Sequence, residues 1–175
     1  MRLYYKPGAC SLSSRIVLTE IGLAFETIRV DTETGQTETG NDYRAINPKG
    51  YVPALELENG AVLTENPAIL QFLADTYPET ALTPAAGTLE RARLQEWLNF
   101  TASELHKAFS PYFRGYPLTA AEKEQVEQRL LARGRQASAR IEAQVHPAHH
   151  GEPDQEADAE DDAGGGHTAG PVLAV

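Results

Sequence analysis

Cys10 is the only cysteine of the chain and the residue best suited to nucleophilic chemistry. The strand-like segment Arg2–Tyr5 ends at Lys6-Pro7-Gly8-Ala9, and a helix-like segment begins at Ser11. Unpaired N–H groups at a helix N-terminus favour a thiolate and lower a cysteine pKa from about 8.5. We therefore predict that Cys10 is reactive and has a depressed pKa. The alternative is a small buried residue with no chemical role.

Two further polar residues could act on one site. His106 follows Asn99 by seven residues in a stretch with helical periodicity, which places both side chains on nearly the same face of the predicted long helix, two turns apart. A neutral His106 could accept the thiol proton, and a charged one could stabilise a thiolate. A lone helical histidine at the surface or in the core is the alternative.

Glu65 and Asn66 stand at a predicted helix start. Pro67 suits the first helical position, which makes Asn66 the N-cap residue. The Glu65 carboxylate could then bind a substrate ammonium, next to a positive helix end that could bind a carboxylate. Alternatively, Glu65 only complements the helix dipole. Upstream, Val52-Pro53 precedes a strand and is a candidate for a cis bond, with a trans turn proline as the alternative.

The first 80 residues predict a mixed α/β domain. Strands are expected at Arg2–Tyr5 and Phe25–Val30, with a helix over Ser13–Gly22 between them. Asp31–Gly40 is predicted to be a loop, followed by a short helix around Asp42–Ile46. Asn59-Gly60 predicts a hairpin between Ala54–Glu58 and Ala61–Leu63, and the next helix should run to about Tyr77. This order is the thioredoxin-like arrangement.

Helices alone follow the linker at Pro84–Gly87. Thr88–Phe113 is predicted to be one long helix. Thr119-Ala120-Ala121-Glu122 is a capping box that opens a last helix, whose apolar positions are Val126, Leu130, Leu131, Ala137 and Ile141. We expect a thioredoxin-like domain at residues 1–80 and a partial all-α domain at residues 88–145.

Charge is distributed unevenly. Residues 1–140 hold 17 acidic and 15 basic residues, a net of −2, whereas residues 141–175 hold 8 acidic residues and no Lys or Arg, a net of −8. The acidity argues against a nucleic-acid partner. Residues 146–175 lack aromatic residues and apolar periodicity, so we expect a disordered acidic tail. The alternative for this segment is a metal site at its histidines, His146, His149 and His150.

No segment predicts export or membrane insertion. The N-terminus lacks a signal-peptide apolar region, and no apolar stretch approaches the ~20 residues that span a bilayer. One cysteine allows no intrachain disulfide, so we expect a cytoplasmic protein.

The chain resembles the cytosolic glutathione transferases, specifically the bacterial beta (cysteine) class. The resemblance rests on four segments in the family's order: Tyr4-Tyr5-Lys6-Pro7-Gly8-Ala9-Cys10-Ser11, Asn47-Pro48-Lys49-Gly50-Tyr51-Val52-Pro53-Ala54-Leu55, Leu63-Thr64-Glu65-Asn66-Pro67-Ala68-Ile69, and Glu96-Trp97-Leu98-Asn99-Phe100 with Glu104-Leu105-His106-Lys107. It covers roughly residues 1–145.

The resemblance implies a set of site residues. Val52, beside Pro53, would pair strand-fashion with the cysteinyl backbone of glutathione, and Glu65 and Asn66 would hold its γ-glutamyl end. Cys10 would be catalytic, with His106 and Asn99 near its sulfur. Tyr5 and Ser11 match the hydroxyl positions of other classes, although Tyr5 also suits the core and Ser11 a helix cap.

The chain departs from the family in two places. The family often has a lysine against the glycyl carboxylate of glutathione where this chain has Gly35; losing that contact would cost about 1.5–3 kcal/mol unless Lys49 or Gln36 replaces it. After Gln144 the family continues into a capping box and further helices, which are absent here. We interpret residues after about 145 as a frame-shifted reading of the gene; the alternative is a natural disordered tail.

These observations predict a glutathione transferase. Cys10 would activate the glutathione sulfur for attack on a small hydrophobic electrophile, or form a mixed disulfide with it. Glutathione would be a co-substrate, and no cofactor or metal is expected. We expect the protein to form a homodimer. The alternative is a non-catalytic fragment or a dimerising scaffold, because without the further helices the apolar faces around Trp97, Leu98 and Leu130 would be exposed.

Overall fold

A computed structural model describes residues 1–113 and 117–145. Its N-terminal part is a five-stranded sheet with the strand order β3-β2-β1-β4-β5. Strands β1 and β2 are parallel and the other neighbours are antiparallel. The strands are β1 (Arg2–Tyr5), β2 (Glu26–Asp31), β3 (Gln36–Thr37), β4 (Ala54–Glu56) and β5 (Val62–Thr64).

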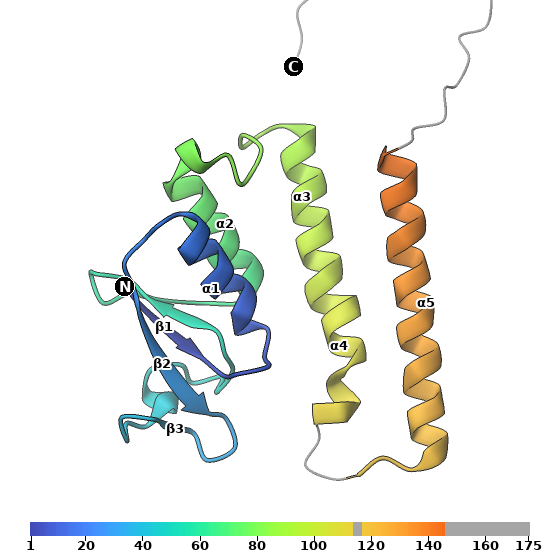
Figure 1. The fold of residues 1–175 in the computed structure, drawn as a ribbon, viewed down its shortest axis with the longest axis horizontal. Helices are drawn as coiled ribbons and strands as arrows, with labels where there is room; N and C mark the ends of the chain where they lie inside the picture. The colour runs from blue at the N-terminus through green and yellow to red at the C-terminus, as the bar shows by residue number, and fades with distance from the viewer. Residues whose placement is uncertain (114–116, 146–175) are drawn as a thin grey trace, which may run out of the picture. The chain divides into compact units, whose positions relative to one another are not determined.

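Two helices pack side by side on one face of this sheet, α1 (Ser11–Glu20) and α2 (Asn66–Thr76), as Figure 1 shows. The thioredoxin-like fold class is therefore confirmed. One expectation about this part is wrong: Asp31–Gly40 is not all loop, because β3 pairs with the end of β2 through Val30↔Thr37 and Asp31↔Gln36. Two residues are too few for the alternating pattern by which a strand is recognised in sequence.

Alternation along β1 builds a core on each face of the sheet. Leu3 packs with Leu18, Leu55, Ile69 and Leu73 beneath α1 and α2, and all five are fully buried. The next residue, Tyr4, points to the opposite face and packs with Val30, Tyr43 and Ala54. Tyr43 belongs to the 3₁₀ turn η1 (Tyr43–Ala45), so this turn closes the second face of the sheet.

The C-terminal described part is helical. A 3₁₀ turn η2 (Pro78–Thr80) precedes α3 (Leu89–Phe100), a π-helical turn η3 (Thr101–Leu105), α4 (His106–Ala108), a 3₁₀ turn η4 (Ser110–Phe113) and α5 (Ala120–Val145). The expected single helix over Thr88–Phe113 is therefore wrong. Its rod is continuous (Figure 1), but it widens into a π turn immediately before His106 and tightens after Ala108.

The Thr119 capping box is confirmed. The Thr119 N–H donates to Glu122 Oε2 at 2.9 Å, and the Glu122 N–H donates to Thr119 Oγ1 at 3.3 Å. Helix α5 is joined to η3 by an ion pair between Arg133 and Glu104, at 2.6 Å.

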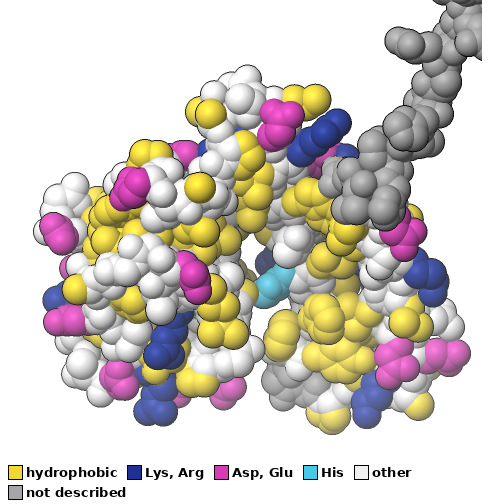
Figure 2. All heavy atoms as spheres, turned by 45° about the horizontal axis from the view of Figure 1, so that its top comes forward, with side chains coloured by type: hydrophobic (Ala, Val, Ile, Leu, Met, Phe, Trp, Pro, Cys, Tyr) yellow, Lys and Arg dark blue, Asp and Glu magenta, His cyan; other side chains and the backbone are white. Residues whose placement is uncertain are grey.

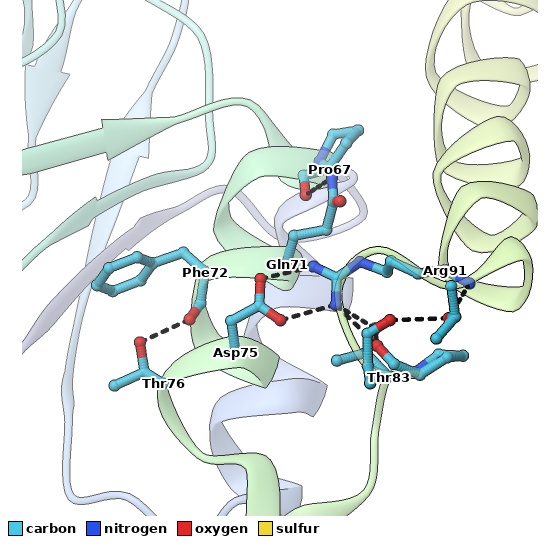
Figure 3. Close-up of polar contacts among 10 residues, drawn as sticks. Pro67, Gln71, Phe72, Asp75, Thr76, Thr83 and Arg91 are labelled. Atoms are coloured by element: carbon cyan, nitrogen blue, oxygen red, sulfur yellow. Dashed lines mark hydrogen bonds and ion pairs between the residues drawn. The ribbon is translucent and has the colours of Figure 1, made fainter. Parts of the chain in front are cut away.

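A buried arginine links the helical part to the thioredoxin-like part. Arg91, in α3, is only 9% exposed. Its guanidinium donates to both carboxylate oxygens of Asp75 in α2, with Nη1 2.7 Å from Oδ1, and also to Thr83 Oγ1 at 2.8 Å (Figure 3). Residues 1–138 form one compact unit. The proposed boundaries between residues 80 and 88 and at residue 145 stay predictions, and residues 146–175 lie outside the described residues.

Candidate functional site

Cys10 lies where the sequence placed it, at the start of α1. The chain between β1 and α1 is held by Ser11, whose hydroxyl accepts from the Lys6 N–H at 3.2 Å. The Cys10 side chain is half-buried, and its thiol donates to the carbonyl oxygen of Val52 at 3.4 Å. Cys10 and Val52 are 42 positions apart in sequence, and the fold thus brings them into contact.

The predicted depression of the Cys10 pKa is wrong. Burial is the largest influence and raises the pKa of this thiol above its ordinary value. The Glu65 carboxylate raises the pKa further, whereas the backbone N–H groups of Cys10 and Ser11 and the Lys107 ammonium lower it. The helix start acts in the expected direction, but burial outweighs it. Cys10 is therefore a thiol at neutral pH and can donate a hydrogen bond.

The Val52-Pro53 bond is cis, as predicted. Two hydrogen bonds hold the segment before this bond, because the Tyr43 hydroxyl and the Asn47 amide each donate to the Tyr51 carbonyl at 2.7 Å. The Val52 N–H donates to no atom of the described residues. Within the described part of the chain, Val52 therefore presents an open N–H and a carbonyl that accepts from the Cys10 thiol alone, which is the pair of groups that an added peptide strand needs.

Asn66 does not cap its helix, contrary to expectation. Helix α2 begins at Asn66 itself, and Glu65 holds the N-cap position without a side-chain hydrogen bond. The Asn66 amide instead donates to the Cys10 carbonyl at 2.6 Å and accepts from the fully buried Ser14 hydroxyl at 2.6 Å. Its side chain thus positions the backbone that carries the thiol.

Glu65 has a positive φ angle of 71°, which is uncommon for a residue with a side chain. Its carboxylate forms an exposed ion pair with the Lys49 ammonium at 2.8 Å. The same ammonium donates to Thr64 Oγ1 at 3.1 Å. A ligand ammonium that binds Glu65 would therefore compete with Lys49.

Among the described residues, no hydrogen bond joins the Asn99 or His106 side chain to Cys10. The π turn between them changes the helical register, so the spacing of seven residues no longer places them two α-helical turns apart. Asn99 is exposed, and the half-buried His106 ring lies 6.4 Å from the Phe113 ring. Their roles stay predictions.

Lys107 is the charged residue of this segment that the sequence reasoning missed. Its ammonium lies over the Tyr51 ring, 5.7 Å from the centroid, and lowers the pKa of the Cys10 thiol. The residue lies inside one of the four segments that carry the resemblance, next to His106.

The two alternative hydroxyls have structural surroundings. Ser11 is 1% exposed, and its hydroxyl donates to the Lys6 carbonyl at 3.3 Å. Tyr5 packs against the core cluster of Leu3. No group of three His, Cys, Asp or Glu side chains that could hold a metal ion occurs in residues 1–113 and 117–145. Within the same residues, no helix is long and apolar enough to cross a bilayer.

Comparison with known proteins identifies the family. The family profile described as glutathione S-transferase, N-terminal domain, matches residues 8–76. A solved bacterial beta class glutathione S-transferase of Sphingomonas chungbukensis is 42% identical, with a TM-score of 0.74, over 86% of this chain and 72% of that one. This chain belongs to the glutathione S-transferase family. The resemblance to the bacterial beta class is confirmed with it.

Two further relatives bear on the site. Glutathione S-transferase GstA of Escherichia coli O157:H7 is 51% identical over 114 residues, 65% of this chain and 57% of the relative. A sphingomonad glutathione S-transferase solved in complex with glutathione is 41% identical, with a TM-score of 0.73, over 83% of this chain and 70% of that one. The matches to curated relatives thus span between 37% and 57% of the length of those relatives.

Proposed function

We propose that this chain binds glutathione and activates its thiol for transfer to a small hydrophobic electrophile. The observation that carries the proposal is the meeting of the Cys10 thiol with Val52, whose N–H is open, beside the cis Pro53. An extended cysteinyl backbone paired with Val52 would bring its own sulfur next to Cys10. Glutathione in complex with a 41% identical relative supports this choice of ligand.

The raised pKa of Cys10 supports one of its two proposed roles, that of a hydrogen-bond donor. A protonated thiol is a poor nucleophile but a hydrogen-bond donor. Cys10 would therefore donate to the glutathione sulfur and lower the pKa of that thiol by stabilising its thiolate. The thiolate then attacks the electrophilic carbon, forms the S–C bond and expels the leaving group with its electron pair, while the glutathione proton goes to solvent.

Glu65 and Asn66 act at the γ-glutamyl end in this proposal. The Glu65 carboxylate exchanges its Lys49 partner for the ligand ammonium. Asn66 contributes the start of α2 for the neighbouring carboxylate, while its side chain holds the Cys10 carbonyl. Asn99 and His106 complete the proposed set from the helical part.

Thiol-disulfide exchange is the second proposed reaction of the same site. A Cys10 thiolate would attack the glutathione sulfur of a mixed disulfide between glutathione and another thiol, bind that sulfur as a Cys10–glutathione disulfide and release the other thiol as its thiolate. Because the chain has no other cysteine to resolve this disulfide, an external glutathione thiolate would attack its glutathione sulfur, leave as oxidised glutathione and restore the Cys10 thiolate. The raised pKa makes this route slow at neutral pH.

A non-catalytic scaffold of the same fold is the competing function. It is favoured by apolar side chains that are exposed on the helical part, where Leu89 is 61% and Leu131 62% exposed. Figure 2 shows apolar side chains open to solvent among charged ones on the face in view. The homodimer, the electrophile and the cytoplasmic location stay predictions from the sequence.

Two measurements on the full chain separate these functions. Isothermal titration calorimetry measures glutathione binding, and the absorbance of the conjugate with an activated aryl chloride measures turnover. Binding with turnover supports the transferase, whereas binding without turnover supports the scaffold. No glutathione binding at millimolar concentration contradicts the proposal.

A further inference from the structure

We infer that Arg44 binds the glycyl carboxylate of glutathione and supplies the cation that Gly35 cannot. The inference rests on the proposed function and adds a specificity-determining residue to the same site. It concerns one end of the ligand only, so it can fail while glutathione binding itself stands.

Hydrogen bonds fix the backbone at Arg44 between two segments. The Arg44 N–H donates to Asp42 Oδ1 at 2.9 Å. The preceding residue, Tyr43, donates its N–H to the Gly35 carbonyl at 2.8 Å and its hydroxyl to the Tyr51 carbonyl at 2.7 Å. Arg44 is therefore held beside the Gly35 loop and beside the segment that leads into Val52.

Two glycines leave room for the guanidinium. A Cβ at Gly35 would lie 3.8 Å from Arg44 Nε, and one at Gly50 would lie 3.7 Å from the same atom. Both glycines have positive φ angles, 75° and 72°, so side chains there are disfavoured on conformational grounds as well. The Arg44 side chain thus lies against the backbone of two residues that have no side chain. One of them, Gly50, is only two residues before Val52.

The charge of Arg44 is open to a ligand. The residue is exposed, and no carboxylate of the described residues forms an ion pair with it. Lys49, by contrast, is paired with Glu65 and Thr64. A guanidinium is planar and can donate two parallel hydrogen bonds to one carboxylate, which suits it to the terminal carboxylate of a peptide ligand.

The chemistry of glutathione selects which carboxylate Arg44 receives. The γ-glutamyl carboxylate shares a carbon with the ammonium, so it follows the ammonium to Glu65 and the start of α2. The glycyl carboxylate, at the other end of the tripeptide, is left for a different cation. Arg44 lies beside both Gly35 and Gly50 with no ion-pair partner in the described residues, whereas Lys107, another cation near this segment, lies over the Tyr51 ring and acts on Cys10.

The test compares two ligands on the full chain by calorimetry: glutathione and γ-glutamylcysteine, which lacks the glycyl residue. We expect Arg44→Gln to weaken glutathione binding about tenfold or more, the loss typical of one charge-assisted contact, and to leave γ-glutamylcysteine binding unchanged. Arg44→Lys should recover part of the loss. Unchanged circular dichroism and thermal midpoint are expected, because the side chain is exposed.

Lys49→Gln is the matched control, a cation one residue from Gly50 that already has partners. It should change the affinities for both ligands by the same factor. Equal binding of glutathione by Arg44→Gln and the wild type overturns the inference, as does an equal loss for both ligands or a glycine-dependent loss in Lys49→Gln. If the wild type binds neither ligand, the proposed function fails together with it.

Discussion

Replacing Asn66 with Ala should destabilise the protein and loosen the backbone that carries Cys10. The substitution removes two hydrogen bonds of 2.6 Å, one to the Cys10 carbonyl and one from the fully buried Ser14 hydroxyl. The Cys10 carbonyl keeps the Ser13 hydroxyl at 2.9 Å, so it is not orphaned. Ser14 loses its acceptor, and an unsatisfied buried group costs about 1–3 kcal/mol. We expect a total loss of about 2 kcal/mol in the free energy of unfolding.

Urea denaturation followed by circular dichroism measures this loss. With an m value of about 2 kcal/mol/M, the midpoint should fall by about 1 M. Asn99→Ala is the matched control, because the Asn99 side chain is exposed and makes no hydrogen bond in the described residues; it should change stability by less than about 0.5 kcal/mol.

A double-mutant cycle tests why Asn66→Ala lowers the free energy of unfolding. If the orphaned hydroxyl carries the cost, Ser14→Ala together with Asn66→Ala should be no less stable than Asn66→Ala alone. An Asn66→Ala midpoint equal to that of Asn99→Ala would refute the reasoning, and fully additive losses would show that the two side chains do not act as one network.

Three further predictions concern charge and the core. The alkylation rate of Cys10 should rise with a midpoint above about 8.5, and Lys107→Gln should move that midpoint higher; a midpoint below 8.5 would contradict the dominance of burial. The Arg91 guanidinium lowers the pKa of Asp75. The pair therefore stabilises the folded protein above the unfolded carboxyl pKa of about 4, and this stability is lost as the pH falls through the folded pKa. Asp75→Asn should remove this loss of the thermal midpoint at acid pH from thermal melts. Leu55→Ala should cost about 2–5 kcal/mol of unfolding free energy in urea, and a cost below 1 kcal/mol would mean that this core is not packed as described.

Local signals predicted local structure well. Asn59-Gly60 indicated the β4–β5 hairpin, and Thr119 with Glu122 indicated the start of α5. Each pattern specifies hydrogen bonds between residues a few positions apart, so neighbours in sequence suffice to recognise it. The thioredoxin-like order followed from adding such elements.

Contacts between distant residues accounted for the errors. The sequence could show Cys10 at a helix start, but its burial beside Val52 depends on a loop 42 residues away, and that burial reverses the sign of the pKa shift. Asn66 has a good capping side chain, yet a buried Ser14 and the Cys10 carbonyl offered it stronger partners. The π turn before His106 has no signal in residue type that periodicity could detect.

The ionisation of bound glutathione tests the central claim most directly. Thiolate absorbance should be titrated against pH for glutathione bound to the wild type, to Cys10→Ser and to Cys10→Ala. We predict a glutathione thiol pKa below that of the free tripeptide in the wild type, a smaller decrease in Cys10→Ser, and no decrease in Cys10→Ala. An equal pKa of bound glutathione in all three proteins would contradict the role of Cys10 as the donor that activates it.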